Sequence, residues 1–269
     1  MLNNFFQSFN EASRKFDYDY IYIDLIFLTI WISILIKNKK WNPIKFGIFT
    51  GIFVYIIDAV WWWNASAGIN YPVGTTIREY WIGGTKIPHP VGEFWLIKFG
   101  ADFMMTFSYS LFIFSWFWIM VDNYRGKLYK EMIKYSVLFF GSWLLTSILS
   151  TLLNIDNTTV ETIRHMDTQM IIWIVNLIIG YFIVVVVYST NRFHSKDLKV
   201  ISYIFLLGCL GSFFMEFPLL ITGIRSSGII FLLFETIILF NQGAPYLYLL
   251  LDKIFPLIGK TIKKERLNN

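Results

Sequence analysis

The 269-residue sequence contains little charge and only one cysteine. Charged side chains make up 15% of it and hydrophobic ones 56%, whereas soluble domains carry about 25% charged residues. This imbalance argues against a water-soluble protein, and the apolar content excludes a disordered or collagen-like chain. The single Cys209 excludes an internal disulfide and therefore a disulfide scaffold.

Several common functional motifs are also missing. There is no glycine-rich phosphate loop and no Ser-His-Asp or Cys-His nucleophile. The sequence therefore leaves any cofactor unknown. The three histidines, His89, His165 and His194, fall in three different loops, which argues against a histidine zinc site or another metal centre. The net charge of +5 comes from short basic segments between apolar runs, so we expect no nucleic-acid partner.

Long apolar runs dominate the sequence instead. About 20 apolar residues span a bilayer, and lipid leaves helices and closed barrels as the only spanning structures. The alternating segments typical of a barrel are absent. Seven runs are long enough to cross as helices: residues 21–36, 44–63, 94–121, 132–153, 168–189, 198–222 and 228–251. The sequence therefore predicts an all-α integral membrane protein, a multi-pass seven-transmembrane-helix bundle with the lipid bilayer as its partner.

Basic residues alternate between the connections of these helices. Clusters of Lys and Arg follow the first, third, fifth and seventh runs, whereas the other connections are neutral or acidic. Lys and Arg of short loops stay on the cytoplasmic side. We therefore predict an external N-terminus and a cytoplasmic C-terminus, in a plasma or cytoplasmic membrane, or in an endomembrane of a eukaryote.

The helical region is flanked by two shorter parts. Residues 1–20 fit an amphipathic helix in the outer interface, and a disordered tail fits nearly as well. Residues 21–251 form the predicted bundle, and residues 252–269 a basic cytoplasmic tail. The outer loop 64–93 is rich in proline and glycine, which predicts ordered turns, and a loop of this length often covers a site.

Charged residues inside the predicted helices are the main functional signal, because they are costly in lipid. At a rise of about 1.5 Å per residue, each lies about 6 to 12 Å below the outer end of its helix. They are Asp24, Asp58, Lys98, Asp102, Glu216 and Glu235. Lys98 lies one turn from Asp102, its simplest partner. Because five acids accompany one lysine, we predict an outward-opening acidic pocket in which at least one of Asp58, Glu216 and Glu235 is protonated.

Polar and aromatic residues at helical spacing extend these faces. We interpret Asp58, Glu216 and Glu235 as candidate catalytic acids. The candidate substrate-binding residues are Lys98, Asp102, Trp62, Tyr109, Trp173 and Asn176. Three alternatives stay open: a purely structural Lys98–Asp102 pair, an Asp24 solvated near the interface, and an aromatic belt in place of a ligand cage.

In layout, the sequence resembles the membrane-bound terpene cyclases. The likeness covers the seven-helix architecture and two positions, the acids Asp58 in the second helix and Glu235 in the seventh. In that family paired acids protonate an isoprenoid substrate, so the resemblance implies this chemistry. The segments Tyr-Ile-Ile-Asp-Ala-Val-Trp around Asp58 and Phe-Glu-Thr-Ile around Glu235 differ from the family signature.

Three functions fit these observations. The first is a membrane-embedded enzyme of the cyclase, isomerase or hydratase type, using acid–base chemistry on a lipid or isoprenoid-like substrate. The second is a proton- or cation-coupled transporter of small solutes, which the lack of a visible repeat and of broken helices disfavours. The third is a ligand-binding or scaffold protein whose acids hold helices together. The expected ligand is a hydrophobic small molecule or a cation.

Overall fold

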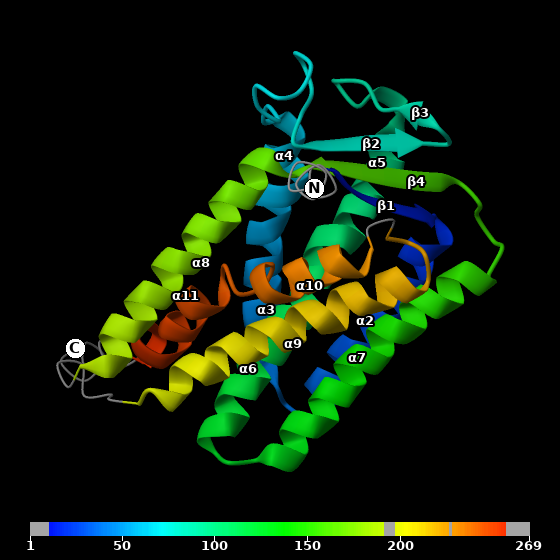
Figure 1. The fold of residues 1–269 in the computed structure, drawn as a ribbon. Helices are drawn as coiled ribbons and strands as arrows, with labels where there is room; N and C mark the ends of the chain where they lie inside the picture. Colours follow the sequence, from blue (N-terminus) through cyan, green and yellow to red (C-terminus); the bar gives the residue numbers. More distant parts are fainter. Residues whose placement is uncertain (1–10, 191–196, 226–227, 257–269) are drawn as a thin grey trace, which may run out of the picture. The chain divides into compact units, whose positions relative to one another are not determined.

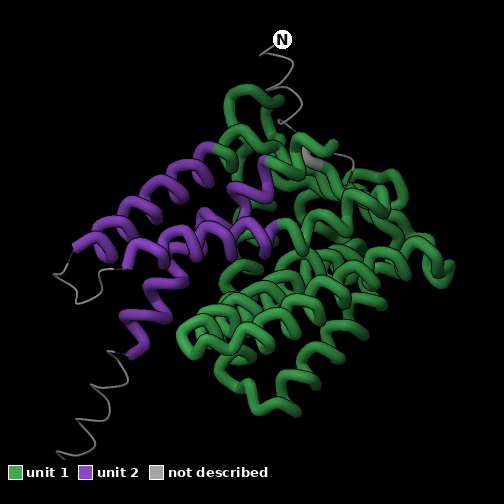
Figure 2. The backbone as a smooth tube through the Cα atoms, turned by 60° about the horizontal axis from the view of Figure 1, so that its bottom comes forward, with its two compact units in different colours: residues 1–170, 213–233 green, residues 171–212, 234–269 purple. Residues whose placement is uncertain are grey.

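A computed structural model of the chain describes residues 11–190, 197–225 and 228–256 (Figure 1). Most of these residues are helical. The chain divides into two compact units (Figure 2). Unit 1 comprises residues 1–170 and 213–233, and unit 2 comprises residues 171–212 and 234–269.

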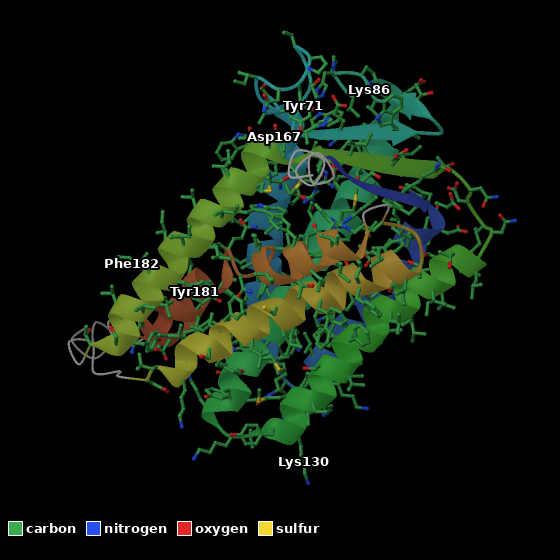
Figure 3. All side chains as sticks on the ribbon, in the orientation of Figure 1. Tyr71, Lys86, Lys130, Asp167, Tyr181 and Phe182 are labelled. Carbon is green, nitrogen blue, oxygen red and sulfur yellow. The ribbon has the colours of Figure 1, made fainter. Side chains whose placement is uncertain are left out.

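Six helical stretches are long and apolar enough to cross a membrane: Asp19–Lys37, Trp41–Asn64, Gly92–Arg125, Tyr129–Leu152, Met166–Ser189 and Lys199–Ile221. The elements that form them are α2 (Asp19–Lys37), α3 (Trp41–Val54), η1 (Tyr55–Trp61), α4 (Trp62–Asn64), η2 (Gly92–Phe94), α5 (Trp95–Asp102), η3 (Phe103–Ser108), α6 (Tyr109–Arg125), α7 (Tyr129–Leu152), α8 (Met166–Ser189) and α9 (Lys199–Ile221). Large apolar side chains on them are exposed, for example Phe53 on α3 (60%) and Phe182 on α8 (67%; Figure 3). This surface suits contact with lipid, and the chain is a mostly helical protein compatible with multiple membrane crossings.

The predicted seventh span is not one continuous helix. Residues 228–251 contain α10 (Ile229–Ile238) and α11 (Ala244–Leu249), which leads into the π-helical η5 (Leu250–Ile254). Between α10 and α11, the side chain of Asn241 donates a hydrogen bond to the backbone carbonyl of Ile237 (2.8 Å). Carbonyl groups at the end of a helix lack partners within the helix, and this bond supplies one. The expectation that no helix is broken is therefore wrong, and seven full spans are not confirmed.

A four-stranded antiparallel sheet in unit 1 joins three segments that are distant in sequence. Its order is β1-β4-β2-β3, with β1 (Glu11–Asp17), β4 (Thr159–His165), β2 (Arg78–Ile82) and β3 (Thr85–Lys86). The helix expected within residues 1–20 is wrong for residues 11–17, and residues 1–10 lie outside the described part. All three segments were expected on one side of the membrane, and their pairing in one sheet agrees with that.

Close packing of backbones positions the second and third long helices of unit 1. A Cβ atom at Gly47 would lie 3.0 Å from the carbonyl oxygen of Leu111, and one at Gly51 would lie 3.0 Å from the ring of Phe107. Two glycines four residues apart thus let α3 approach its neighbour as small residues do in membrane helix pairs.

π-helical turns interrupt the same two helices beside the predicted site. Asp58 lies within η1, and η3 begins directly after Asp102. A π-turn bonds i to i+5 and adds one residue to the turn, so it rotates the residues that follow relative to a regular α-helix. The faces expected from uninterrupted α-helical spacing therefore shift after Asp102.

Candidate functional site

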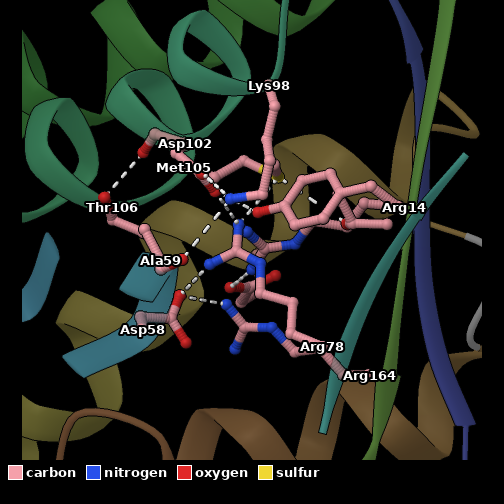
Figure 4. A network of polar contacts seen from close by, with 12 residues as sticks. Arg14, Asp58, Ala59, Arg78, Lys98, Asp102, Met105, Thr106 and Arg164 are labelled. Atoms are coloured by element: carbon pink, nitrogen blue, oxygen red, sulfur yellow. Dashed lines mark hydrogen bonds and ion pairs between the residues drawn. The ribbon is translucent and has the colours of Figure 1, made fainter. Parts of the chain in front are cut away.

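Asp58 lies between two arginines of the sheet. Nη1 of Arg78 and Nη2 of Arg164 each lie 2.6 Å from Oδ2 of Asp58 (Figure 4). Arg78 on β2 and Arg164 on β4 are direct partners in the strand register. Because like charges directly opposite each other destabilise a sheet, the carboxylate compensates a repulsion that the register creates.

Asp102, the last residue of α5, is the second carboxylate of this group. Nζ of Lys98 lies 2.6 Å from its Oδ2, as the spacing of one helical turn predicts. The hydroxyl of Tyr80 donates to Oδ1, and Nη2 of Arg78 lies 3.5 Å from the same oxygen. Arg78 therefore links Asp102 and Asp58 into one network.

Glu216 in α9 repeats the arrangement seen at Asp58. Nη2 of Arg14 lies 2.6 Å from its Oε1, and Nη1 of Arg225 lies 2.5 Å from its Oε2. Arg14 and Arg225 are partners in an isolated antiparallel bridge. The hydroxyl of Tyr109 donates to Oε1 over 3.4 Å. Glu216 is fully buried, so a second pair of opposed arginines shares one carboxylate in an apolar environment.

The arginines around Asp58 and those around Glu216 both influence the pKa of Arg164. Burial lowers the pKa of the Arg164 guanidinium, and Asp58 opposes that change. The positive charges of Arg78, Arg14 and Arg225 lower this pKa further. Since Coulomb interactions weaken with distance, Arg164 lies within the influence of both arginine pairs.

The ion pairs around Asp58, Asp102 and Glu216 involve several basic side chains. The cations are Arg14, Arg78, Lys98, Arg164 and Arg225, and the carboxylates are Asp58, Asp102 and Glu216. The expectation of many acids around one lysine is wrong for this site, because four arginines from outside the apolar runs contact the acids. Asp58 and Glu216 each contact two guanidinium groups. The prediction that at least one of Asp58, Glu216 and Glu235 is protonated stays a prediction.

A small cavity in unit 1 borders the Glu216 group. Residues in its lining include Arg14, Phe16, Tyr20, Tyr109, Trp143 and Leu219. It has room for about one water molecule. Most of the lining is apolar, and the guanidinium of Arg14 and the tyrosine side chains supply polar groups at its wall.

The other candidates in unit 1 lie outside this network. Asp24 in α2 is fully buried and accepts a hydrogen bond from Ser108 (3.0 Å), so the alternative of an Asp24 solvated near the interface is wrong. Trp62 stacks on Trp61 with 5.7 Å between ring centroids. This contact fits an aromatic cluster at a helix end as well as a ligand-binding role.

The remaining three candidates belong to unit 2. Glu235 and Trp173 are buried, with exposures of 2% and 4%. The backbone carbonyl of Asn176 accepts a hydrogen bond from the hydroxyl of Tyr246 (2.9 Å). The prediction that Glu235 shares a pocket with the acids of unit 1 stays a prediction.

Four arginines that contact these acids were missed, because they lie outside the apolar runs. Two of them end the same tripeptide, Thr-Ile-Arg, at Arg78 and at Arg164. Short runs that alternate β-branched residues with polar ones are typical of strands. That pattern would have suggested two strands carrying arginine, although not their pairing.

Comparisons with known proteins found no relative of the chain. No protein family, no characterised protein and no solved structure matches it. The function therefore has to be argued from the geometry and the chemistry of the site.

Proposed function

We propose that the protein is a membrane-embedded enzyme that binds a lipid- or isoprenoid-like molecule in the cavity beside Glu216. The observation that carries this proposal is the mixed lining of the cavity. Phe16, Trp143 and Leu219 supply apolar surface, while Arg14 and Tyr109 supply polar groups. Such a lining suits a molecule with an apolar body and one polar end.

In this proposal, Tyr109 is the proton donor for acid–base chemistry in the cavity. Its side chain lines the cavity, and its hydroxyl donates to the carboxylate of Glu216. Tyr109 would transfer this proton to a bound substrate. The guanidinium of Arg14, 5.9 Å from the centre of the Tyr109 ring, would stabilise the phenolate that remains. In this proposal Asp58 orients Arg78 and Arg164, and Glu216 orients Arg14 and Tyr109.

Filling the cavity tests the binding site. Leu219→Phe places a larger side chain at a cavity-lining position that is 3% exposed, whereas Leu206→Phe makes the same change at a position on α9 that is 55% exposed. Both variants would be checked for folding by circular dichroism. A diazirine-bearing isoprenoid alcohol should crosslink to peptides of unit 1 in the wild type and in Leu206→Phe, and much less in Leu219→Phe. Equal crosslinking in the two variants would contradict the proposed site.

Removing one hydroxyl tests the chemistry separately. Tyr109→Phe keeps the ring but has no proton to transfer, so it should still crosslink the probe. Conversion of unlabelled isoprenoid alcohols to isomerised, cyclised or hydrated products, followed by mass spectrometry, should fall by about 10²- to 10⁴-fold. Unchanged product formation in Tyr109→Phe would contradict its role as the acid.

The break between α10 and α11 favours a second candidate, a coupled transporter. Discontinuous helices often place polar groups at transporter binding sites. In unit 2 the hydroxyl of Tyr181 donates to Oδ1 of Asn241 at this break (2.6 Å). Proteoliposomes under a proton gradient, with a pH-sensitive dye inside, should then show proton flux. Asn241→Leu should abolish this flux, and Thr190→Ala, at an exposed position, should retain it. Flux no higher than in empty vesicles would contradict this candidate.

A further inference from the structure

Two short turns of unit 1, between α2 and α3 and between α6 and α7, have the same backbone conformation. Lys39 in the first turn and Lys127 in the second both have a φ of 55°. The next residues also match, with φ and ψ of −85° and 56° at Lys40 and of −90° and 61° at Leu128. In both turns the N–H group of this next residue donates to the carbonyl five residues earlier, over 2.8 Å. The same helix ending is therefore built twice.

Lysine is an unusual residue at these two positions. A φ of this kind favours glycine, because the Cβ atom of any other residue lies too close to the following carbonyl oxygen. Every other residue with a positive φ in the described ranges is a glycine. Both turns thus keep a strained basic residue where glycine would be more stable, and strained residues of this kind gather at binding sites.

The side chain of Lys40 brings the first turn against α7. Its Nζ lies 5.9 Å from the centre of the Tyr135 ring, and Nζ of Lys134 lies 5.2 Å from the same centre. Tyr135 lies near the start of α7, directly behind the second turn, so the two turns share one end of unit 1. This is the end of Lys130, opposite Lys86 (Figure 3). The basic residues in and beside the two turns are Lys37, Lys39, Lys40, Lys45, Arg125, Lys127, Lys130 and Lys134.

Two carboxylates accompany these basic residues. Oε2 of Glu131 lies 3.5 Å from Nζ of Lys134, and both side chains are exposed. Oδ2 of Asp122 accepts a hydrogen bond from the indole nitrogen of Trp118 (3.1 Å). An exposed ion pair contributes little to stability. Lys134 can therefore leave Glu131 for another anion without a large loss.

Two buried hydrogen-bond donors near the turns have no partner in the part of the chain that the structure describes. The side chain of Tyr135 is fully buried, and its hydroxyl makes no hydrogen bond there. The buried Asn123 has an unpaired Nδ2, and its carbonyl accepts the bond from Leu128 that closes the second turn. A buried donor without an acceptor is unfavourable. Each donor would gain from an acceptor that enters at this end.

Exposed apolar side chains border the two turns. They are Trp41 at the start of α3, Leu128 in the second turn, and Tyr129 and Ile133 at the start of α7. Aromatic and basic residues together are typical of the boundary between lipid tails and headgroups. This surface suits a phosphate that is attached to acyl chains, whereas a free phosphate ion would contact only the polar groups.

We propose that these two turns bind the phosphate group of an anionic phospholipid, with the hydroxyl of Tyr135 and the ammonium groups of Lys40 and Lys134 as its direct contacts. Hydrogen bonds to a charged acceptor are stronger than those to a neutral one. Basic residues next to a membrane-spanning helix attract anionic lipids. The two lysine side chains are flexible, so a phosphate that draws them outward exposes the hydroxyl. The site shares no residue with the cavity beside Glu216 and does not depend on the function proposed there.

The test measures lipid binding to the full, delipidated chain in dodecyl maltoside by native mass spectrometry. The probes are a phosphatidylglycerol and the phosphatidylcholine with the same acyl chains. Phosphatidylglycerol should bind more tightly, because the lysines repel the choline cation. Glycerol phosphate, which has no acyl chains, should compete only weakly with it. Equal binding of the two lipids, or competition by glycerol phosphate as strong as that by the lipid, would contradict the proposal.

Removing one hydroxyl separates binding from structure. Tyr135→Phe keeps the buried ring, so stability in lipid-free detergent should be unchanged or slightly higher than in the wild type. Its affinity for phosphatidylglycerol should fall by about tenfold, because a hydrogen bond to a charged group is lost. Tyr22→Phe, at an exposed position of α2, is the matched control and should bind as the wild type does. Equal affinities of wild type and Tyr135→Phe overturn the inference.

Two lysine variants give an independent measurement if Tyr135→Phe fails to fold. Lys40→Gln removes the charge next to Tyr135 and should weaken lipid binding severalfold, whereas Lys15→Gln, the same change at an exposed position of β1, should not. Lys39→Gly removes a charge and relieves the strained backbone, so it should raise stability without lipid and weaken lipid binding. Unchanged affinity in the folded Lys40→Gln and Lys39→Gly variants contradicts the site.

Discussion

Arg78 and Arg164 face each other across β2 and β4, and a single oxygen of Asp58 lies 2.6 Å from a nitrogen of each. The carboxylate comes from a helix and the two cations come from the sheet. Asp58 thus holds two like charges together and also fixes the position of the sheet over the helices of unit 1. Burying the charge of Asp58 looks unfavourable when its helix is considered alone. The two arginines of the sheet compensate that charge.

Removing the charge of Asp58 should therefore destabilise unit 1 strongly. In Asp58→Asn two opposed guanidinium groups lose their shared carboxylate, and breaking a buried ion pair in this way costs about 3 to 5 kcal/mol. Asp17→Asn, at an exposed position of β1, should change stability by less than about 1 kcal/mol. Thermal unfolding in detergent measures both.

A second substitution distinguishes charge repulsion from general damage at this position. Adding Arg164→Met to Asp58→Asn removes one of the two repelling charges, so the double variant should recover part of the lost stability. If the two losses simply add, the repulsion between Arg78 and Arg164 is not the cause.

Replacing glycine by alanine should have opposite effects at Gly47, which packs against α6, and at Gly141, which has open space beside it. Gly47→Ala forces a methyl group against the backbone of Leu111 and should destabilise the protein by about 1 to 3 kcal/mol. Gly141→Ala on α7 meets no atom within 4 Å and should stabilise the protein by about 0.5 to 1 kcal/mol, because alanine favours helix more than glycine does. Chemical denaturation in mixed micelles measures both, and a loss of similar size in both variants would contradict the close approach.

The stacking of His89 on Trp63 predicts a pH-dependent contribution to stability. Burial, and then the positive charge of Lys98, lower the pKa of His89 below its usual value of about 6.5. The unfolded chain therefore binds a proton more readily than the folded one, so stability falls as the pH drops below about 6.5 and is fully present above it. The effect is modest because the ring is partly exposed.

Unfolding curves at about pH 7.5 and about pH 5.5 test this window. His89→Gln has no imidazole to protonate, so its stability should depend less on pH than that of the wild type over this range. Identical pH dependence in the two proteins would show that His89 does not contribute.

Topology can be tested with single cysteines in a Cys209→Ala background. Thr85→Cys lies in the hairpin of the long loop, and Lys130→Cys lies at the start of α7, at the opposite end of unit 1 from Lys86 (Figure 3). Because the basic connections predict their side of the membrane, an impermeant maleimide should label Thr85→Cys on intact cells and Lys130→Cys only after permeabilisation. The reverse pattern would overturn the predicted orientation.

Features that depend on neighbouring residues in the chain were predictable from the sequence. The long helices follow from apolar runs, and six of the seven appear as continuous helical stretches. The contact between Lys98 and Asp102 follows from their spacing of one turn. The break in residues 228–251 had a local signal, Gly243 and Pro245, but the high hydropathy around it favoured a single span.

Features that depend on distant pairing were not predictable. The strands are short, and the placement of Arg78 opposite Arg164 depends on a register that no local pattern determines. The π-helical turns η1 and η3 shift the helical faces. No sequence pattern in these two segments indicates that each turn contains an extra residue. The expectation that one lysine accompanies the acids was therefore wrong around Asp58 and Glu216, because arginines of the strands contact both.

The order of the strands has a consequence for biogenesis. β1 is synthesised first, but its neighbour β4 follows only after α7, and the backbone bond from Lys15 to Ile224 needs the residue that follows α9. The native pairing of β1 therefore cannot form before helices α2 to α7 have been synthesised. Arg14 in turn meets its carboxylate only when α9 is in place. Closure of the sheet in its native register thus needs both β1 and the segment after α9, and it is a late step in the synthesis of the chain.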